Sequence, residues 1–123
     1  MSSEHTPWDL AVQAADTVRC LNRRALRPDA FPFPTDVHHT LGALAGMLEQ
    51  LPDTLHRLAA GLHALPADHL AVHADPPTPE EYKARVALEL GEAIADIERA
   101  AARLRQAQHT AAELVWTGPI PGL

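Results

Sequence analysis

The sequence predicts an all-α protein, an elongated antiparallel helical hairpin with an N-terminal helix packed alongside, which together make a three- to four-helix bundle. Only 4% of its 123 residues are aromatic, and few β-branched residues alternate as a half-buried strand requires. Alanine and leucine dominate instead, and they recur at helical intervals. A threonine followed by a proline marks two helix starts, at Thr6 and at Thr78.

The first helix is predicted over residues 7–26. Thr6 is the expected N-cap, Pro7 takes the first helical position, and Asp9 completes a capping box with the Thr6 backbone. The apolar residues of this helix form one stripe: Leu10, Ala11, Ala14, Ala15, Val18, Leu21 and Ala25. The loop that follows, residues 27–35, contains three prolines, which end the helix.

The second helix is predicted over residues 36–65, and it carries an unbroken heptad repeat. Its apolar positions alternate in spacings of four and three: Val37, Leu41, Leu44, Leu48, Leu51, Leu55, Leu58, Leu62 and Leu65. Pro52 removes a backbone donor to the Leu48 carbonyl, yet the repeat keeps its phase on both sides. We therefore expect a kink at Pro52 within one helix. The alternative is two helices that meet at residues 51–53.

The third helix is predicted over residues 79–115, and an apolar tail, residues 116–123, follows it. Its expected apolar stripe has the same alternation of four and three: Val86, Leu90, Ala93, Ile97, Ala100, Leu104, Ala107, Ala111 and Leu114. Ala87, Leu88, Ile94 and Ala101 widen this apolar arc. We expect the leucines of the second helix to pack over the alanine-rich stripe of the third.

Composition indicates one helical domain over residues 1–123 and excludes several classes of protein. The net charge of −6 argues against general affinity for nucleic acid or an anionic membrane. The only cysteine, Cys20, cannot form an internal disulfide, and residues 1–5 lack the basic and apolar regions of a signal peptide. We therefore expect a cytoplasmic protein. No cofactor is predicted.

A homodimer is predicted from the wide apolar arc of the third helix, which exceeds what two shorter helices can cover. Ile97 and Leu104 are the residues expected at this interface. The alternative is a monomer in which the first helix covers the arc.

Two proline-stiffened apolar segments, residues 31–34 and the tail, are candidates for contact with an unidentified partner protein. Phe31, Phe33, Trp116 and Ile120 are their candidate interaction residues. They either fold back over the ends of the bundle or serve as extended ligands for a groove on another protein.

Arg19, Arg23 and Arg27 share one face near the end of the first helix, where they could bind an anion or an acidic partner. The helix macrodipole favours cations at this position without any ligand.

A helical turn that carried His69 and His73, four residues apart, would offer two ligands for zinc. An exposed polar turn explains these histidines equally well, so no metal site is predicted.

The leading functional prediction is a non-catalytic helical interaction or adaptor protein that self-associates through its leucine and alanine stripes. No catalytic triad order or glycine-rich phosphate loop is present in the sequence. The alternative is a histidine-rich helical bundle that binds a metal or small ligand. A third possibility is a small transcriptional regulator that uses residues 19–27.

Overall fold

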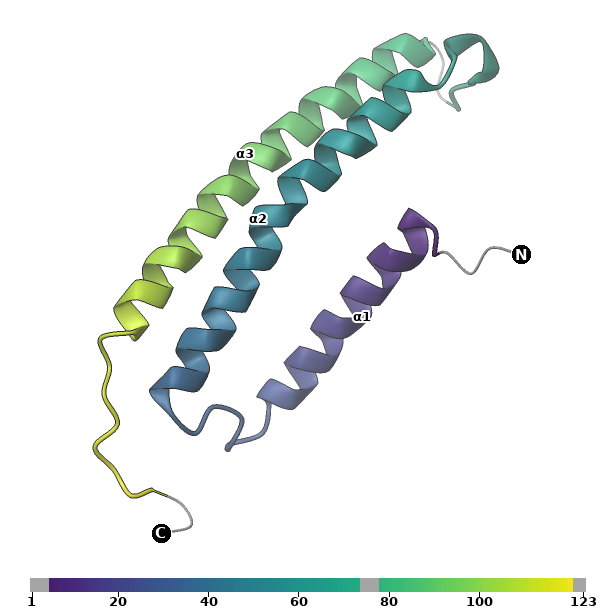
Figure 1. Cartoon of the computed structure of the whole chain (residues 1–123). Coiled ribbons are helices and arrows are strands. Elements are labelled where there is room, and N and C mark those ends of the chain that lie inside the picture. The colour runs from purple at the N-terminus through teal and green to yellow at the C-terminus, as the bar shows by residue number, and fades with distance from the viewer. Residues whose placement is uncertain (1–4, 74–77, 121–123) are drawn as a thin grey trace.

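The computed structural model describes residues 5–73 and 78–120, and within them the protein is all-helical, as predicted. The elements in chain order are α1 (Pro7–Ala25), α2 (Pro34–Ala64), the short 3₁₀ helix η1 (Ala67–His69) and α3 (Pro79–Ala111). Helices α2 and α3 run antiparallel and form a long hairpin, and α1 lies beside it (Figure 1). The hairpin is the only pair of described helices with extensive contacts.

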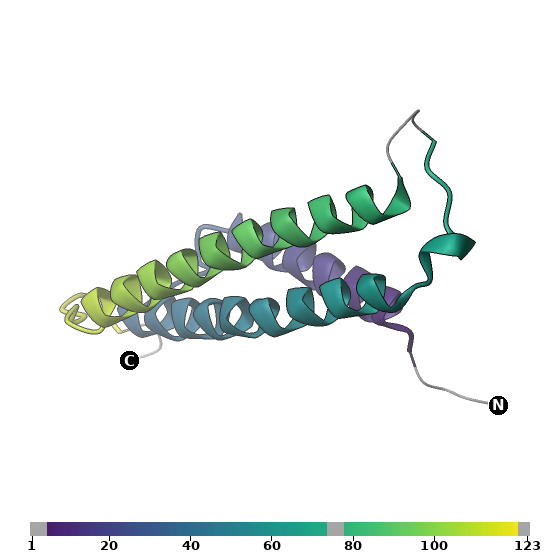
Figure 2. The same cartoon turned by 90° about the horizontal axis from the view of Figure 1, so that it is seen from above.

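The core of the hairpin is narrow and built mainly from alanine. Among the described residues the buried side chains are Ala45, Ile94, Ala101 and Ala111. Three of these four are alanines, which let the helix backbones approach closely. Seen from above, α2 and α3 converge toward the end where α2 begins and α3 ends (Figure 2). Near the connection, by contrast, Leu58 of α2 and Val86 of α3 are exposed, so burial is greater away from the connection between the two helices.

The face of α3 that packs on α2 keeps Leu90, Ile97, Leu104 and Ala111 of the predicted stripe, but it is centred toward Ile94 and Ala101, which were predicted at the edge of the apolar arc. Ile94, Ala101 and Ala111 are buried, whereas Ala100 and Ala107 of the predicted stripe are exposed. Half-buried residues complete the same face: Leu90, Ile97, Leu104 and Gln108. Gln108 is polar, so the apolar spacing predicts its neighbour Ala107 as the packing residue instead. The prediction of Ala93, Ala100 and Ala107 as packing positions was wrong for the last two.

Helix α2 continues through Pro52 as a single helix, so the alternative of two shorter helices is wrong. The helix starts at Pro34, two residues before the expected position, because the Asp36 carboxylate accepts a hydrogen bond from the Phe33 backbone N–H at 3.0 Å. Pro34 occupies the first helical position, where its missing N–H costs nothing. The helix ends at Ala64, one residue earlier than predicted.

Helix α1 has the predicted start but buries no residue. The Thr6 hydroxyl accepts from the Asp9 N–H at 3.0 Å, and the Asp9 carboxylate accepts from the Thr6 N–H at 3.1 Å. Within the helix only Val18 and Leu21 are even half-buried, and Trp8 is 79% exposed. Helix α1 therefore lies next to the hairpin without the close packing that was expected.

Helix α3 starts as predicted, with Thr78 as N-cap and Pro79 at the first position, although the Thr78 side chain makes no capping bond. It ends at Ala111, not at residue 115. His38, in the second turn of α2, contacts the Gln108 backbone, so α2 begins close to where α3 ends. Beyond this point α3 has no helix to pack against, and the chain turns away into the tail.

Candidate functional site

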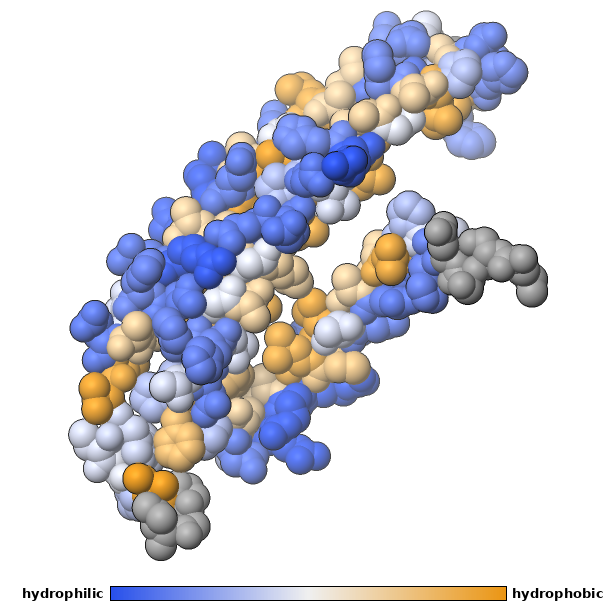
Figure 3. Space-filling view, viewed as in Figure 1, coloured by the Kyte–Doolittle hydropathy of each residue, from blue (hydrophilic) through white to orange (hydrophobic). Residues whose placement is uncertain are grey.

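The most distinctive surface feature is an open apolar groove between the start of α1 and the second half of α2. Its volume is about 510 Å³, and it is lined by Pro7, Thr54, Arg57, Leu58, Gly61, Leu62 and Leu65. Figure 3 shows hydrophobic side chains of α1 and of the hairpin on the two sides of this open gap. Such a groove suits an apolar partner more than a polar substrate.

The floor of the groove follows from the leucine repeat of α2. Leu58 and Leu65 are seven residues apart and so lie on the same side of the helix, and Leu58 is 55% exposed. Gly61, between them, has open space around the position of a Cβ atom. Leu10 and Val12 of α1 are also exposed. Apolar side chains therefore remain uncovered on both helices, as expected where a partner is missing.

Two polar residues line the groove, Thr54 and Arg57, and Arg57 forms a solvated ion pair with Asp53 beside it. Arg57 Nε donates to the Asp53 carboxylate at 2.9 Å, four residues earlier on α2. This hydrogen bond raises the pKa of the Arg57 guanidinium, which stays charged. Among the residues lining the groove, none is an acid, a histidine or a cysteine that could act in general acid-base or nucleophilic catalysis.

A polar cluster fixes the register of the hairpin. Arg105 of α3 donates to Glu49 of α2 through Nε at 3.0 Å and through Nη2 at 2.6 Å, and its Nη1 donates to Gln108 Oε1 at 2.9 Å. Gln108 lies against Gly42, where a Cβ atom would be 2.5 Å from the amide nitrogen. His38 Nδ1 donates to the Gln108 carbonyl at 3.1 Å. A shift of one helix along the other would break these contacts together.

The stability of the hairpin should depend on pH through Glu49. The hydrogen bonds from Arg105 lower the pKa of Glu49 from its ordinary 4.5. A carboxylate with a lower pKa in the folded state contributes stability above the unfolded pKa, which is lost as pH falls through the folded pKa. Wild type should therefore lose more stability than Glu49→Gln when the pH is lowered from about 6 to about 3. Urea unfolding at the two pH values measures this, and equal losses in the two proteins would contradict it.

Lys83 joins the two helices at their more open end, and sequence reasoning missed it. Its Nζ donates to the backbone carbonyls of His63 at 3.1 Å and Leu65 at 2.8 Å. These carbonyls belong to the last turn of α2 and its C-cap, where helical donors are lacking. Lys83 is the only lysine of the chain, but nothing in its local sequence signals a contact made about 20 residues away in the chain.

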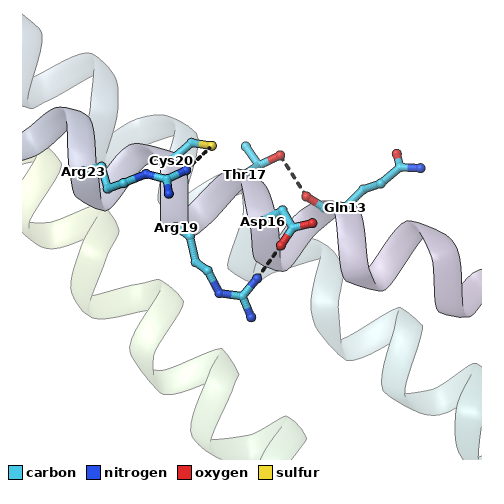
Figure 4. A network of polar contacts seen from close by, with 6 residues as sticks. All are labelled: Gln13, Asp16, Thr17, Arg19, Cys20 and Arg23. Atoms are coloured by element: carbon cyan, nitrogen blue, oxygen red, sulfur yellow. Dashed lines mark hydrogen bonds and ion pairs between the residues drawn. The ribbon is translucent and has the colours of Figure 1, made fainter.

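The three arginines predicted to bind an anion, Arg19, Arg23 and Arg27, make local contacts. Arg19 pairs with Asp16, and Arg23 Nη2 donates to Cys20 Sγ at 3.2 Å, so both side chains bond along α1 itself (Figure 4). Helix α1 ends at Ala25, and Arg27 lies two residues beyond it, where its backbone N–H donates to the Arg24 carbonyl at 3.3 Å. An anion site at Arg19, Arg23 and Arg27 stays a prediction.

The two proline-stiffened segments meet at the tight end of the hairpin. The Phe33 and Trp116 rings lie edge to face with centroids 5.3 Å apart, and Trp116 Nε1 donates to the Pro119 carbonyl at 3.0 Å. Phe33, Trp116 and Ile120 line a shallow apolar hollow, whereas Phe31 is not among its lining residues. The last residues of the predicted tail, 121–123, lie outside the described residues.

His69 and His73 are not on one helical turn, so the geometry proposed for a zinc pair is wrong. Helix η1 ends at His69, and His73 lies beyond it in irregular chain. The Nε2 of His69 is 3.9 Å from the neighbouring Asp68 carboxylate, and both side chains are exposed. Within residues 5–73 and 78–120, no three histidine, cysteine, aspartate or glutamate residues are grouped as metal ligands.

Ile97 and Leu104, expected at a dimer interface, are half-buried on the α3 face that packs on α2. Part of the apolar surface of these two side chains is therefore already covered by α2 of the same chain. Large apolar side chains that stay exposed lie on α1, on α2, near the start of α3 and in the tail, and those that line the groove are Leu58 in the second half of α2 and Leu65 at its C-cap.

No protein-family model, curated protein or solved structure matches this chain. None of the helices in the described part of the chain is both long enough and apolar enough to span a membrane. The groove and the uncovered face of α1 are therefore the features from which a function can be argued.

Proposed function

We propose that the protein is a non-catalytic helical interaction protein that self-associates and receives partner helices on the apolar surface of α1 and the α2 groove. The single observation that carries this proposal is the uncovered apolar surface: α1 buries no residue, and Leu58, Gly61 and Leu65 form an open floor opposite its start. A helix with an apolar stripe gains stability in water mainly by packing that stripe against another element.

The chemistry of the groove favours a helix as the bound element. Leu58, Leu62 and Leu65 follow the four- and three-residue spacing that receives the apolar residues of a partner helix. Gly61 allows a close approach of the partner, because no side chain fills the space above it. An unpaired cysteine suits a reducing compartment, so we place this association in the cytoplasm.

Replacing Leu58 with aspartate tests the proposal. Leu58→Asp should weaken self-association at least about tenfold, because a charge would replace apolar area that the complex buries. Leu88→Asp is the matched control, since Leu88 is 64% exposed on α3 and does not line the groove. Sedimentation velocity across micromolar concentrations measures the association, with circular dichroism confirming that helicity is kept. A wild type that stays monomeric, or an equal effect of both variants, would overturn the proposal.

A further inference from the structure

The apolar stripe of α1 faces the groove on α2. Pro7 of α1 lines the groove together with residues of α2. Leu10, Ala14 and Val18 follow Pro7 by three, seven and eleven residues, so they lie on the same side of α1 as Pro7 does. The stripe, which has no buried residue, is therefore directed at an apolar face of its own chain.

Both apolar faces are least covered at the groove. On α1, Leu21 near the end of the helix is half-buried, whereas Leu10 near its start is 53% exposed. On α2, Leu44 and Leu51 are half-buried, whereas Leu58, on the same side of the helix, is 55% exposed. Figure 3 shows the open space between the start of α1 and the hairpin. Apolar surface is thus left in water on both sides of one narrow gap.

No side-chain hydrogen bond or ion pair in the described part of the chain ties α1 to α2 or α3. Those of α1 run along the helix itself, as from Arg19 to Asp16 and from Arg23 to Cys20 (Figure 4). Helices α2 and α3, in contrast, are joined by the pair of Arg105 and Glu49. A movement of α1 toward α2 therefore breaks none of these contacts.

The loop between α1 and α2 contains a position for a hinge. On its α1 side, the Ala30 N–H donates to the Arg27 carbonyl at 3.1 Å. On its α2 side, the Phe33 ring contacts the Trp116 ring and so belongs to the hairpin. Between these two points, residues 31 and 32 make no backbone hydrogen bond. Rotation there moves α1 as a unit while the hairpin keeps its contacts.

We propose that α1 is a lid over the groove, which rotates about residues 31 and 32 and packs its apolar stripe onto α2. Closing removes apolar surface from water on both sides, notably that of Leu10 and Leu58. An amphipathic helix is stabilised mainly by such packing. For the partner helices of the function proposed above, on which this consequence rests, only the open state binds. The closed fraction therefore lowers their apparent affinity.

Thiol labelling of a groove position tests the lid. Gly61 lines the groove and has open space where a Cβ atom would stand, and Gly91 on α3 has the same open space but does not line the groove. Gly61→Cys and Gly91→Cys are each made with Cys20→Ser, which removes the exposed native thiol, and alkylation by iodoacetamide is timed. The thiol at position 61 should react at least about fivefold more slowly, because only the open state exposes it. Arg57, one turn earlier, would speed this reaction, so charge does not explain the slowing.

A second substitution on α1 shows whether α1 is the cover. Leu10→Asp added to Gly61→Cys should raise the labelling rate to that of Gly91→Cys, because a charge on the stripe opposes its packing. Val12→Asp is the matched control, since Val12 is 46% exposed and lies about 200° around α1 from Leu10. With Val12→Asp the thiol at position 61 should stay slow. Circular dichroism checks that both variants keep their helicity.

Protein concentration separates the lid from self-association. A lid of the same chain slows the labelling of position 61 already at concentrations where sedimentation shows a monomer. Slowing that appears only as the concentration rises would show that a second copy covers the groove, which would overturn the lid and support self-association. Equal rates at positions 61 and 91, or a slow rate at 61 that Leu10→Asp leaves unchanged, would also overturn the lid. A monomer at every concentration would overturn self-association, while slow labelling reversed by Leu10→Asp would still establish the lid.

Discussion

Replacing Ala45 with aspartate is expected to unfold the hairpin. Ala45 is 0% exposed, on the face of α2 that packs on α3. An aspartate there would bury a carboxylate without a partner and would also push apart two helices that approach closely over small side chains. We expect the free energy of unfolding to fall by about 3 kcal/mol or more. Urea titration followed by circular dichroism measures the loss.

Ala43→Asp is the control for this substitution. Ala43 lies two residues earlier in the same helix and is exposed, so the new carboxylate stays in water. It should cost less than about 1 kcal/mol, which reflects the lower helix propensity of aspartate. Similar losses for the two variants would mean that Ala45 does not face α3 in solution.

Replacing Ile94 with alanine should have the second largest effect. Ile94 is 8% exposed and is the only large side chain among the buried residues of the described chain. Its truncation removes buried methylene groups and leaves a cavity between α2 and α3, so we expect a loss of about 2–4 kcal/mol. The midpoint of urea unfolding should fall accordingly, with the slope unchanged.

Ile120→Ala is the chemically matched control, because Ile120 lies in the tail and is 56% exposed. It should cost less than about 1 kcal/mol. If Ile94→Ala were as mild as Ile120→Ala, the face of α3 that packs on α2 would be different, and the predicted stripe through Ala93 and Ala100 would regain support.

The starts of α1 and α3 could be predicted because they depend on neighbouring residues. Thr6 and Asp9 form a capping box within one turn, with Pro7 at the first helical position, so their spacing alone determines the geometry. The continuous helix through Pro52 was also predictable, because the leucine repeat keeps its phase on both sides of the proline. The end of α3 could not be predicted, because it depends on the position of the start of α2, a segment that is distant in the sequence.

The candidate site was only partly predictable. Leu58, Leu62 and Leu65 were identified as members of one apolar repeat, but the repeat does not show which of them α3 covers. Leu58 and Leu65 remain exposed and Leu62 is half-buried at the edge of the groove. Likewise Gln108 and Arg105 could not be assigned to the packing face of α3, because their partners Gly42 and Glu49 lie more than 50 residues away in the chain.

The sequence by itself determined the number and type of the three long helices and the starts of α1 and α3. These features arise from caps, prolines and apolar spacing, all of which act within a few residues. Only the tertiary structure decided the phase of α3 on α2, the contact of Lys83 with the end of α2, and the open position of α1. Each of these features depends on contacts between residues that are far apart in the sequence. How side chains fit between two helices, and which polar groups pair across them, cannot be read from the apolar pattern of either helix alone.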